Sequence, residues 1–212
     1  MIARRKKLPV VLEPEEAQKL ILLPNKRYLT GLRNKAILSL MLNMGLRVSE
    51  VVNLRPGDLN LTKRKLRVVN GKGGVDRDLV IPEGLIELLK EWKKRKPQNS
   101  NYFFTTIKNK KGKITFKNGT ERDVSSKPGK KLSVRYIQAR IKKYAKKADI
   151  SKNISPHTLR HTFGTFFYRQ TKDIETLRKL LGHSDISTTQ IYVTLANIDV
   201  ENAMNGYKII VW

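Results

Sequence analysis

The fold of this chain is decided by the stretch Leu180-Leu-Gly-His-Ser-Asp-Ile-Ser-Thr-Thr-Gln-Ile-Tyr192. A glycine directly after apolar residues is typical of the C-terminal end of a helix, so a helix is expected to end at Gly182 with His183 next to it. Tyr192 follows nine residues after the histidine and is expected on the next helix. A tyrosine within a helix is most often a core residue, so this stretch alone assigns it no chemical role.

A second polar stretch, Ser155-Pro-His-Thr-Leu-Arg-His-Thr-Phe, lies upstream and holds two of the three histidines. Because His157 and His161 are four residues apart, they could share a helical face and bind a metal ion. The turn between them carries Arg160 in place of the glutamate of a zinc protease, and a guanidinium would repel the ion. His157 and Arg160, adjacent on one face near a helix N-terminus, are better suited to bind phosphate, with an accidental surface pair as the alternative.

Two further cations lie in the first half of the chain. Arg47, in Gly45-Leu-Arg-Val-Ser-Glu, is expected at the start of a helix with Glu50 one turn later. A surface ion pair between these two residues is the alternative, and it would contribute little stability. Lys72 lies in the turn Asn70-Gly-Lys-Gly-Gly-Val-Asp, which lacks the spacing of a phosphate-binding P-loop. We expect it at the tip of a hairpin, where many lysines serve solubility only.

The charge of the chain indicates a polyanionic partner. Its 212 residues include 44 Lys and Arg against 18 Asp and Glu, a formal net charge of +26 that exceeds what solubility requires. The basic residues are spread along the whole chain and not confined to one tail. This distribution favours an extended nucleic-acid backbone over an anionic membrane surface.

Several other classes of protein are disfavoured by composition. No stretch approaches the roughly 18 apolar residues of a membrane span, and the run at 36–46 is interrupted by Ser39 and Asn43. The N-terminus lacks the apolar region of a secretory signal. The chain has no cysteine, hence no disulfide, thiol nucleophile or Cys-ligated zinc. A soluble protein is therefore expected, and the lack of cysteine fits a reducing compartment such as the cytoplasm.

Hydrophobic periodicity predicts an α+β domain that is mainly helical, with a small three-stranded antiparallel sheet. The strands are expected at 59–61, 66–69 and 79–81, with Lys72 in the turn between the last two. Helices are expected at 14–23, 29–44, 85–96, 133–148, 158–170, 173–181, 187–193 and 198–204.

The chain is expected to form a single domain over 1–212 with a basic leader at 1–9. The segment 108–131 holds nine basic residues and four glycines or prolines, which predicts a basic surface loop or hairpin near DNA. Lysines on the helix at 133–148 fit a solvated face and a DNA-facing one equally well. The apolar tail at 195–212 would be unfavourable if left in water.

The order and spacing of these motifs resemble the tyrosine recombinases, also called the phage integrase family. The resemblance covers roughly residues 8–194 and is greatest to Xer-like bacterial and archaeal members. It rests on six positions that carry the pattern of the family: Arg47, Lys72, His157, Arg160, His183 after Gly182, and Tyr192.

The resemblance implies a role for each position. Tyr192 would attack a DNA phosphorus, forming a 3′-phosphotyrosine and releasing a 5′-hydroxyl. Arg47 and Arg160 would bind the nonbridging oxygens, and His183 would donate a further hydrogen bond. Guanidinium groups suit phosphate, and preorganised donors stabilise developing charge.

The remaining two positions would handle protons. Lys72 would protonate the 5′-oxygen leaving group, and His157 would assist as general base and by positioning. The resemblance implies no cofactor, no catalytic metal ion and no need for ATP, because the covalent intermediate stores the energy of the broken bond.

The resemblance also implies double-stranded DNA as partner and self-association on DNA as a dimer or tetramer. Integration of a mobile element, excision and resolution of chromosome dimers would use the same residues, so the biological task stays open. Family members usually have a separate N-terminal domain that helps to clamp DNA, whereas here the catalytic pattern begins almost at Met1. We therefore expect either a minimal or excised catalytic domain, or a clamp supplied by another chain. The tail at 195–212 is expected to dock on a neighbouring subunit, with packing on its own domain as the alternative.

Two other functions remain open. A type IB topoisomerase shares the tyrosine chemistry, but the His157-x-x-Arg160 and Gly182-His183 spacing favours a recombinase. A non-catalytic DNA-binding protein on the same fold is the second alternative, and the presence of a matching residue at all six catalytic positions argues against it.

Overall fold

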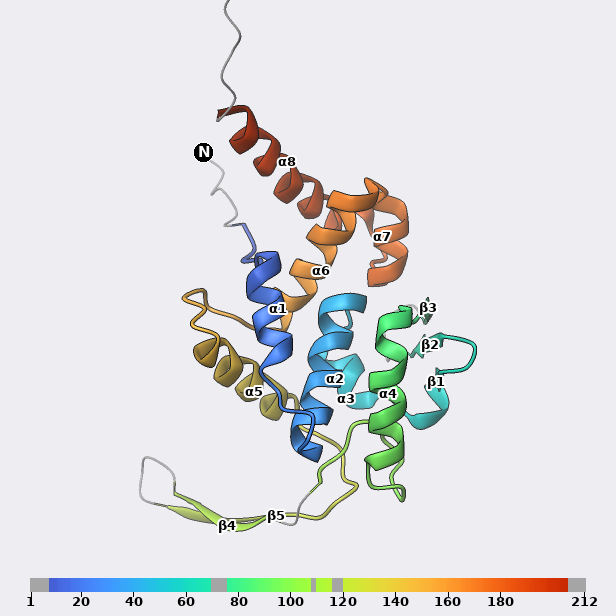
Figure 1. Cartoon of the computed structure of the whole chain (residues 1–212), viewed down its shortest axis with the longest axis vertical. Coiled ribbons are helices and arrows are strands. Elements are labelled where there is room, and N and C mark those ends of the chain that lie inside the picture. Colours follow the sequence, from blue (N-terminus) through green and yellow to red (C-terminus); the bar gives the residue numbers. More distant parts are fainter. Residues whose placement is uncertain (1–7, 70–75, 108–109, 116–119, 206–212) are drawn as a thin grey trace, which may run out of the picture.

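Helix α2 (Leu29–Met44) lies at the centre of the fold (Figure 1). Buried residues occur on all its sides, and such a helix has to be covered by neighbouring elements. It contacts α1 (Pro14–Leu22), α3 (Val48–Asn53), α4 (Glu83–Arg95) and α6 (Pro156–Thr171). The main hydrophobic core is built around it.

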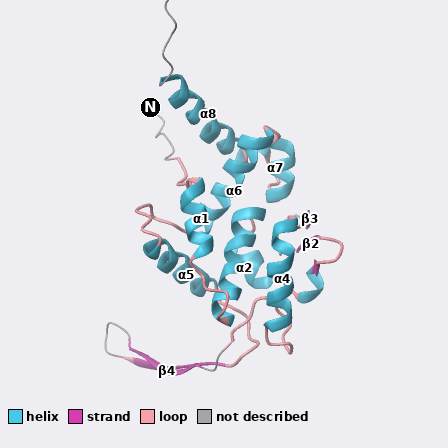
Figure 2. Ribbon diagram, in the orientation of Figure 1, coloured by secondary structure: helices cyan, strands magenta, loops and turns pink. Residues whose placement is uncertain are grey.

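The computed structural model describes residues 8–69, 76–107, 110–115 and 120–205. Helices dominate these residues, as Figure 2 shows, and none of them is long and apolar enough to cross a membrane. Besides the five helices above they comprise α5 (Val134–Lys147), α7 (Ile174–Leu181), α8 (Gln190–Asn205) and the short 3-10 helices η1 (Pro56–Asp58) and η2 (Ile186–Thr188).

Three short strands form the small sheet. They are β1 (Leu59–Asn60), β2 (Lys65–Val68) and β3 (Arg77–Val80), paired antiparallel in the order β1-β2-β3. Leu66 pairs with leucines of both neighbouring strands, and all three leucines are buried. One face of the sheet therefore joins the core, and the predicted three-stranded antiparallel sheet is confirmed.

A second antiparallel pair projects away from the helices (Figure 1). Strand β4 (Lys110–Thr115) pairs with β5 (Glu121–Ser126) along their full length. This hairpin lies within 108–131, the segment for which the sequence predicts a basic loop or hairpin.

The C-terminal helices enclose a second, smaller apolar cluster. Leu177 and Leu181 of α7 pack with Tyr192 and Leu195 of α8, and Phe163 of α6 lies against them. This cluster brings the end of α7 and the start of α8 onto the surface of α6. It therefore fixes both ends of the stretch Leu180–Tyr192, through Leu181 and Tyr192.

Most of the predicted helices are confirmed, and α2 has the predicted bounds with Gly45 as its C-cap at φ 63°. The helices predicted at 187–193 and 198–204 are wrong, because η2 is followed by the single helix α8. The Asp185 side chain accepts a hydrogen bond from the backbone of Ser187 and caps the short 3-10 helix. Beyond it, no glycine or proline interrupts α8, and the buried Leu195 holds it to the domain.

Candidate active site

The C-terminal end of α7 collects three arginine side chains. Arg77 Nε donates to the Leu180 carbonyl at 2.7 Å, and Arg160 Nη2 donates to the Leu181 carbonyl at 2.7 Å. Arg47 Nη1 reaches the same Leu181 oxygen at 3.4 Å. The last carbonyls of a helix lack partners within the helix and lie at the negative end of its dipole, so they attract cations. The end of α7 thereby gathers guanidinium groups from α6, β3 and the start of α3.

A left-handed glycine at the end of each of two helices makes these contacts possible. Gly182 ends α7 at φ 64° and Gly45 ends α2 at φ 63°. In this conformation the chain turns away and leaves the helix carbonyls accessible. Arg160 Nη1 donates to the Gly45 carbonyl at 2.7 Å, so the buried side chain of Arg160 bridges the ends of α2 and α7.

Glu50 supplies the negative charge of this cluster. Its side chain is 3% exposed and accepts two hydrogen bonds from Arg77, at 2.9 and 3.0 Å. It also accepts bonds from the backbone N–H and Nη1 of Arg47, at 2.7 and 3.1 Å. The expected ion pair between Arg47 and Glu50 is present, but it is not a surface pair, because Glu50 is buried between two arginines.

Electrostatics favour an anion at this place. Burial by itself would raise the pKa of Glu50, but the hydrogen bonds and charge of Arg77 and the Arg47 backbone N–H hold it below its usual value. Burial, with the charge of Arg47 adding to it, lowers the pKa of Arg160 to about 10, so this guanidinium stays charged at neutral pH. Three cations thus face one carboxylate among the described residues of the cluster. The excess of positive charge matches a phosphate group.

His183, directly after Gly182, is held between two side chains. Its Nε2 lies 2.9 Å from Arg160 Nη2, and its Nδ1 lies 2.9 Å from the hydroxyl oxygen of Thr189. A guanidinium can only donate, so Nε2 accepts and the imidazole proton is on Nδ1. Burial, with the charges of Arg160 and Arg47, lowers the pKa of His183 to about 4. The imidazole is therefore neutral at neutral pH.

Tyr192 lies in the apolar cluster and also borders the charged site. Its side chain is buried, and the residue is only 1% exposed. The hydroxyl lies 3.2 Å from Nδ1 of His161, one residue after Arg160 on α6. Burial raises the pKa of Tyr192, with the charges of Arg160 and Arg47 acting in the opposite sense. The phenol is therefore neutral and hydrogen-bonded in this structure.

The sequence of the chain is similar to a known family and to curated proteins. The model of the phage integrase family matches residues 10–197. The chain belongs to this family. The tyrosine recombinase XerA of Pyrococcus horikoshii is 35% identical over 205 residues, which are 97% of this chain and 64% of the relative. The tyrosine recombinase XerD of Staphylococcus saprophyticus is 34% identical over 202 residues, which are 95% and 63%. The chain thus spans slightly less than two thirds of the length of these curated relatives.

A crystal structure of XerA recombinase has the same fold. It superposes with a TM-score of 0.72 at 27% identity and covers 97% of this chain and 67% of that chain. The predicted tyrosine recombinase catalytic-domain fold is thereby confirmed.

Four of the six residues that match the pattern of the phage integrase family meet at one place: Arg47, Arg160, His183 and Tyr192. His157 lies at the start of α6 with an exposed side chain, close enough for its charge to lower the pKa of His161. Among the described residues no hydrogen bond joins His157 to Arg160 or Tyr192, and His161 contacts the tyrosine instead.

Lys72 lies outside the described residues. The strand that follows its turn is nevertheless anchored at the site, because β3 begins with Arg77. Arg77 is bound to Glu50 and to the end of α7. The described chain therefore enters the charged cluster at Arg77, five positions after Lys72.

Several residues of the site were missed from the sequence. Arg77 was not singled out, and His161 was considered only as a metal ligand. Glu50 gave a usable signal, since an acidic residue among the apolar residues of Val48-Ser-Glu-Val-Val indicates a buried, paired carboxylate. Thr189 gave none, because its contact with His183 depends on the turn at η2.

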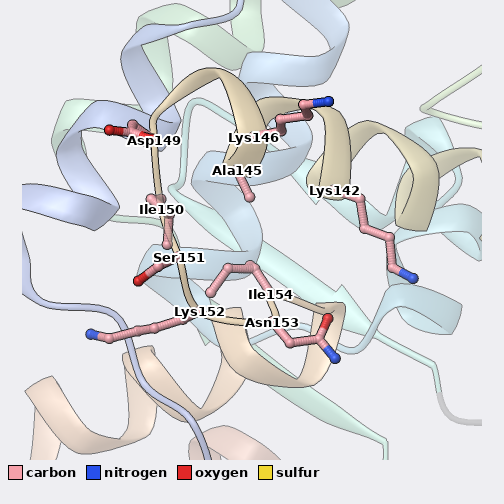
Figure 3. Close-up of a pocket in the computed structure, with 9 residues that line it drawn as sticks. All are labelled: Lys142, Ala145, Lys146, Asp149, Ile150, Ser151, Lys152, Asn153 and Ile154. Carbon is pink, nitrogen blue, oxygen red and sulfur yellow. The ribbon is translucent and has the colours of Figure 1, made fainter.

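A separate basic pocket lies between the end of α5 and the start of α6 (Figure 3). It has a volume of about 260 Å³ and contains none of the site residues. Lys142, Lys146 and Lys152 line it, but their ammonium groups point in different directions (Figure 3). Lys152 is bound to Glu16 at 2.6 Å. The pocket therefore does not assemble a converging anion site.

The packing of Tyr192 on α6 yields a stability prediction. A Cβ added to Gly164 would lie 2.6 Å from Cζ of the Tyr192 ring. We expect Gly164→Ala to lower the free energy of unfolding by about 1–3 kcal/mol, because the ring must leave its place. Gly84→Ala in α4 is the matched control, since nothing lies within 4 Å of its added Cβ. It should be neutral or stabilising by up to about 1 kcal/mol. Equal stability of both variants in urea unfolding would contradict the contact.

The environment of His183 yields a pH prediction. In long-range 1H–15N NMR spectra we expect a neutral imidazole protonated on Nδ1, which titrates near pH 4 and not near the usual 6.5. Because the unfolded chain binds this proton at the higher pH, the stability of the folded state should fall as the pH drops from about 6.5 towards 4. His183→Gln should reduce this acid sensitivity. A midpoint near 6.5, or a proton on Nε2 at neutral pH, would rule out the contact with Arg160.

Proposed function

We propose that this chain is the catalytic part of a site-specific recombinase that cleaves and rejoins DNA strands through a 3′-phosphotyrosine on Tyr192. The observation that carries the proposal is the cluster of Arg47, Arg77 and Arg160 around Glu50, with Tyr192 close enough for the charges of Arg160 and Arg47 to lower its pKa. The names of the two relatives, tyrosine recombinases XerA and XerD, support the same reaction.

Arg47 and Arg160 bind the nonbridging oxygens of the scissile phosphate in this proposal. The Arg47 side chain is 34% exposed, so it can meet an incoming phosphate, whereas Arg160 is buried and already fixed by two carbonyls. Donors held in place before the reaction stabilise the charge of the transition state without reorganisation. Arg77, which is bound to Glu50 and Leu180, positions the other groups.

The phosphate itself prepares His183 for its proposed role. In this structure Nε2 of His183 accepts a hydrogen bond from Arg160 and cannot donate. A phosphate oxygen can replace it as the acceptor of Arg160, and a nearby negative charge raises the pKa of an imidazole. Protonated at Nε2, His183 then donates to a phosphate oxygen.

The reaction conserves the phosphodiester bond energy. The Tyr192 hydroxyl gives its proton to a neighbouring histidine as its oxygen bonds to phosphorus, and the bond from phosphorus to the 5′-oxygen breaks with its electron pair on that oxygen. Lys72 delivers a proton to the 5′-oxygen. Attack of a 5′-hydroxyl on the phosphotyrosine reverses these steps, so rejoining needs no ATP. The proposed residues supply all the charges and protons without a metal ion or cofactor.

The partner is double-stranded DNA. The net charge of +26 supports it, as do the four exposed lysines on α5, which fit a DNA-facing side of the helix: Lys142, Lys143, Lys146 and Lys147. Self-association on paired sites as a dimer or tetramer, with the end of the 195–212 tail docked on a neighbour, belongs to the same proposal. So does a cytoplasmic location at the nucleoid. Leu195 and Ala196 are buried within their own domain, so docking would involve later residues.

The charge predicts the response to salt and chelators. Logarithmic affinity for duplex DNA should fall with logarithmic salt concentration at a slope of about −5 or steeper, as expected for six or more neutralised phosphates. Covalent adducts should form equally well with EDTA present. One labelled duplex serves to measure both the affinity and the covalent adducts. Salt-insensitive binding would contradict the DNA contacts, and loss of adducts in EDTA would contradict the metal-free chemistry.

The roles of nucleophile and proton donor can be separated by changing the leaving group. Tyr192→Phe should abolish adducts on every substrate. Lys72→Ala should slow cleavage of ordinary DNA by about 100-fold or more, the usual scale for a general acid. A substrate with sulfur at the bridging 5′ position should rescue Lys72→Ala, because a thiolate leaves without protonation, but should not rescue Tyr192→Phe.

Lys63→Ala is the matched control for charge, since Lys63 is an exposed lysine in the β1–β2 turn. It should cleave both substrates like the parent protein. Failure of sulfur to rescue Lys72→Ala would show that this lysine is not the general acid. Adducts on Tyr192→Phe would refute the proposed function.

A further inference from the structure

We propose that His161 accepts the proton of the Tyr192 hydroxyl when the tyrosine attacks phosphorus, a role that the sequence pattern gives to His157. This inference rests on the proposed function and specifies one of its steps. The sequence alone does not distinguish His157 from His161 for this role, since both lie in Ser155-Pro-His-Thr-Leu-Arg-His.

The geometry distinguishes the two histidines. His161 Nδ1 lies 3.2 Å from the Tyr192 hydroxyl oxygen, and the two ring centroids are 5.8 Å apart. His157 lies one turn earlier, at the N-terminal end of α6, and its side chain is exposed. A proton acceptor must be within hydrogen-bond reach of the proton that it takes, and His161 meets this condition.

The position of the tyrosine is fixed from the same helix. Gly164 follows His161 by three residues, so both lie on one face of α6, and the Tyr192 ring packs against that glycine. Arg160 precedes His161 directly. One helix thus carries the guanidinium that would bind the phosphate, the imidazole that would accept the proton and the surface that holds the nucleophile.

The protonation states fit the transfer. Burial lowers the pKa of His161, and the charges of His157 and Arg160 lower it further, so its imidazole is neutral near neutral pH. Burial raises the pKa of Tyr192, which makes a phenolate rare without a base. For Nδ1 to accept, the imidazole must carry its own proton on Nε2.

The proton transfer between Tyr192 and His161 is reversible. As the Tyr192 oxygen bonds to phosphorus, its proton moves to Nδ1 of His161, and the 5′-oxygen leaves with a proton from Lys72. The imidazolium then lies beside Arg160 and His157, which disfavour its charge. It therefore returns the proton readily when a 5′-hydroxyl displaces the tyrosine.

The test compares His161→Asn with His157→Asn. An asparagine oxygen at position 161 can take the place of Nδ1 and keep the hydrogen bond to Tyr192, but it cannot accept the proton. We expect single-turnover cleavage by His161→Asn to fall by about 100-fold or more, the scale of a general base. The loss in His157→Asn should be smaller. Binding of duplex DNA by each variant reports whether it is folded.

Fluorinated tyrosine at position 192 separates a base from a structural contact. Its phenol is more acidic, so it depends less on a base. Fluorination should shrink the deficit of His161→Asn at least tenfold and leave that of His157→Asn unchanged. An unchanged deficit in His161→Asn, cleavage at the parent rate, or shrinkage of the His157→Asn deficit instead would overturn the inference. Absence of adducts with the unmodified parent protein would refute the proposed function itself, which is a different result.

Discussion

The buried carboxylate of Glu50 is the interaction on which the site depends. It binds Arg47 of its own helix and Arg77 of β3, and through Arg77 it ties the sheet to the end of α7. Desolvating these charges is costly, and the cost is offset only where the hydrogen bonds are satisfied. Glu50 accepts four of them. Without this anion the guanidinium groups would repel one another, and Arg77 would keep only its bond to the Leu180 carbonyl to hold β3 beside α7.

The second constraint is that the C-terminal ends of two helices, α2 and α7, both accept hydrogen bonds from one side chain, Arg160. Arg160 is placed by α6, whose packing on α2 forms part of the main core, and its guanidinium joins the last carbonyls of α2 and α7. Left-handed glycines at both ends direct the chain away from those oxygens. The hydrophobic core and the charged site are therefore not independent. Packing of α2, α6 and α7 sets the position of the arginine, and the arginine satisfies carbonyls that the helices themselves cannot satisfy.

Local patterns predicted much of this structure. The bounds of α2, the glycine that ends α7 and the three strands follow from periodicity and glycine placement. Contacts between distant residues could not be predicted in this way. Arg77 and Glu50 are separated by 27 positions, and Arg160 reaches a carbonyl 115 positions away. That His161 and not His157 contacts the tyrosine likewise depends on how α8 packs on α6. The sequence of either helix alone does not determine this packing.

The reactive groups of the site are paired with one another in this structure. Arg160 donates a hydrogen bond to His183, and the Tyr192 hydroxyl is hydrogen-bonded to His161 beside an apolar cluster. Each pairing satisfies a buried polar atom, and an unpaired one would be costly. A phosphate is the group that can take the place of these internal partners, because it accepts from guanidinium and imidazolium alike and matches the excess positive charge. Under the proposed mechanism the phosphate therefore replaces hydrogen-bond partners that these groups have within the protein.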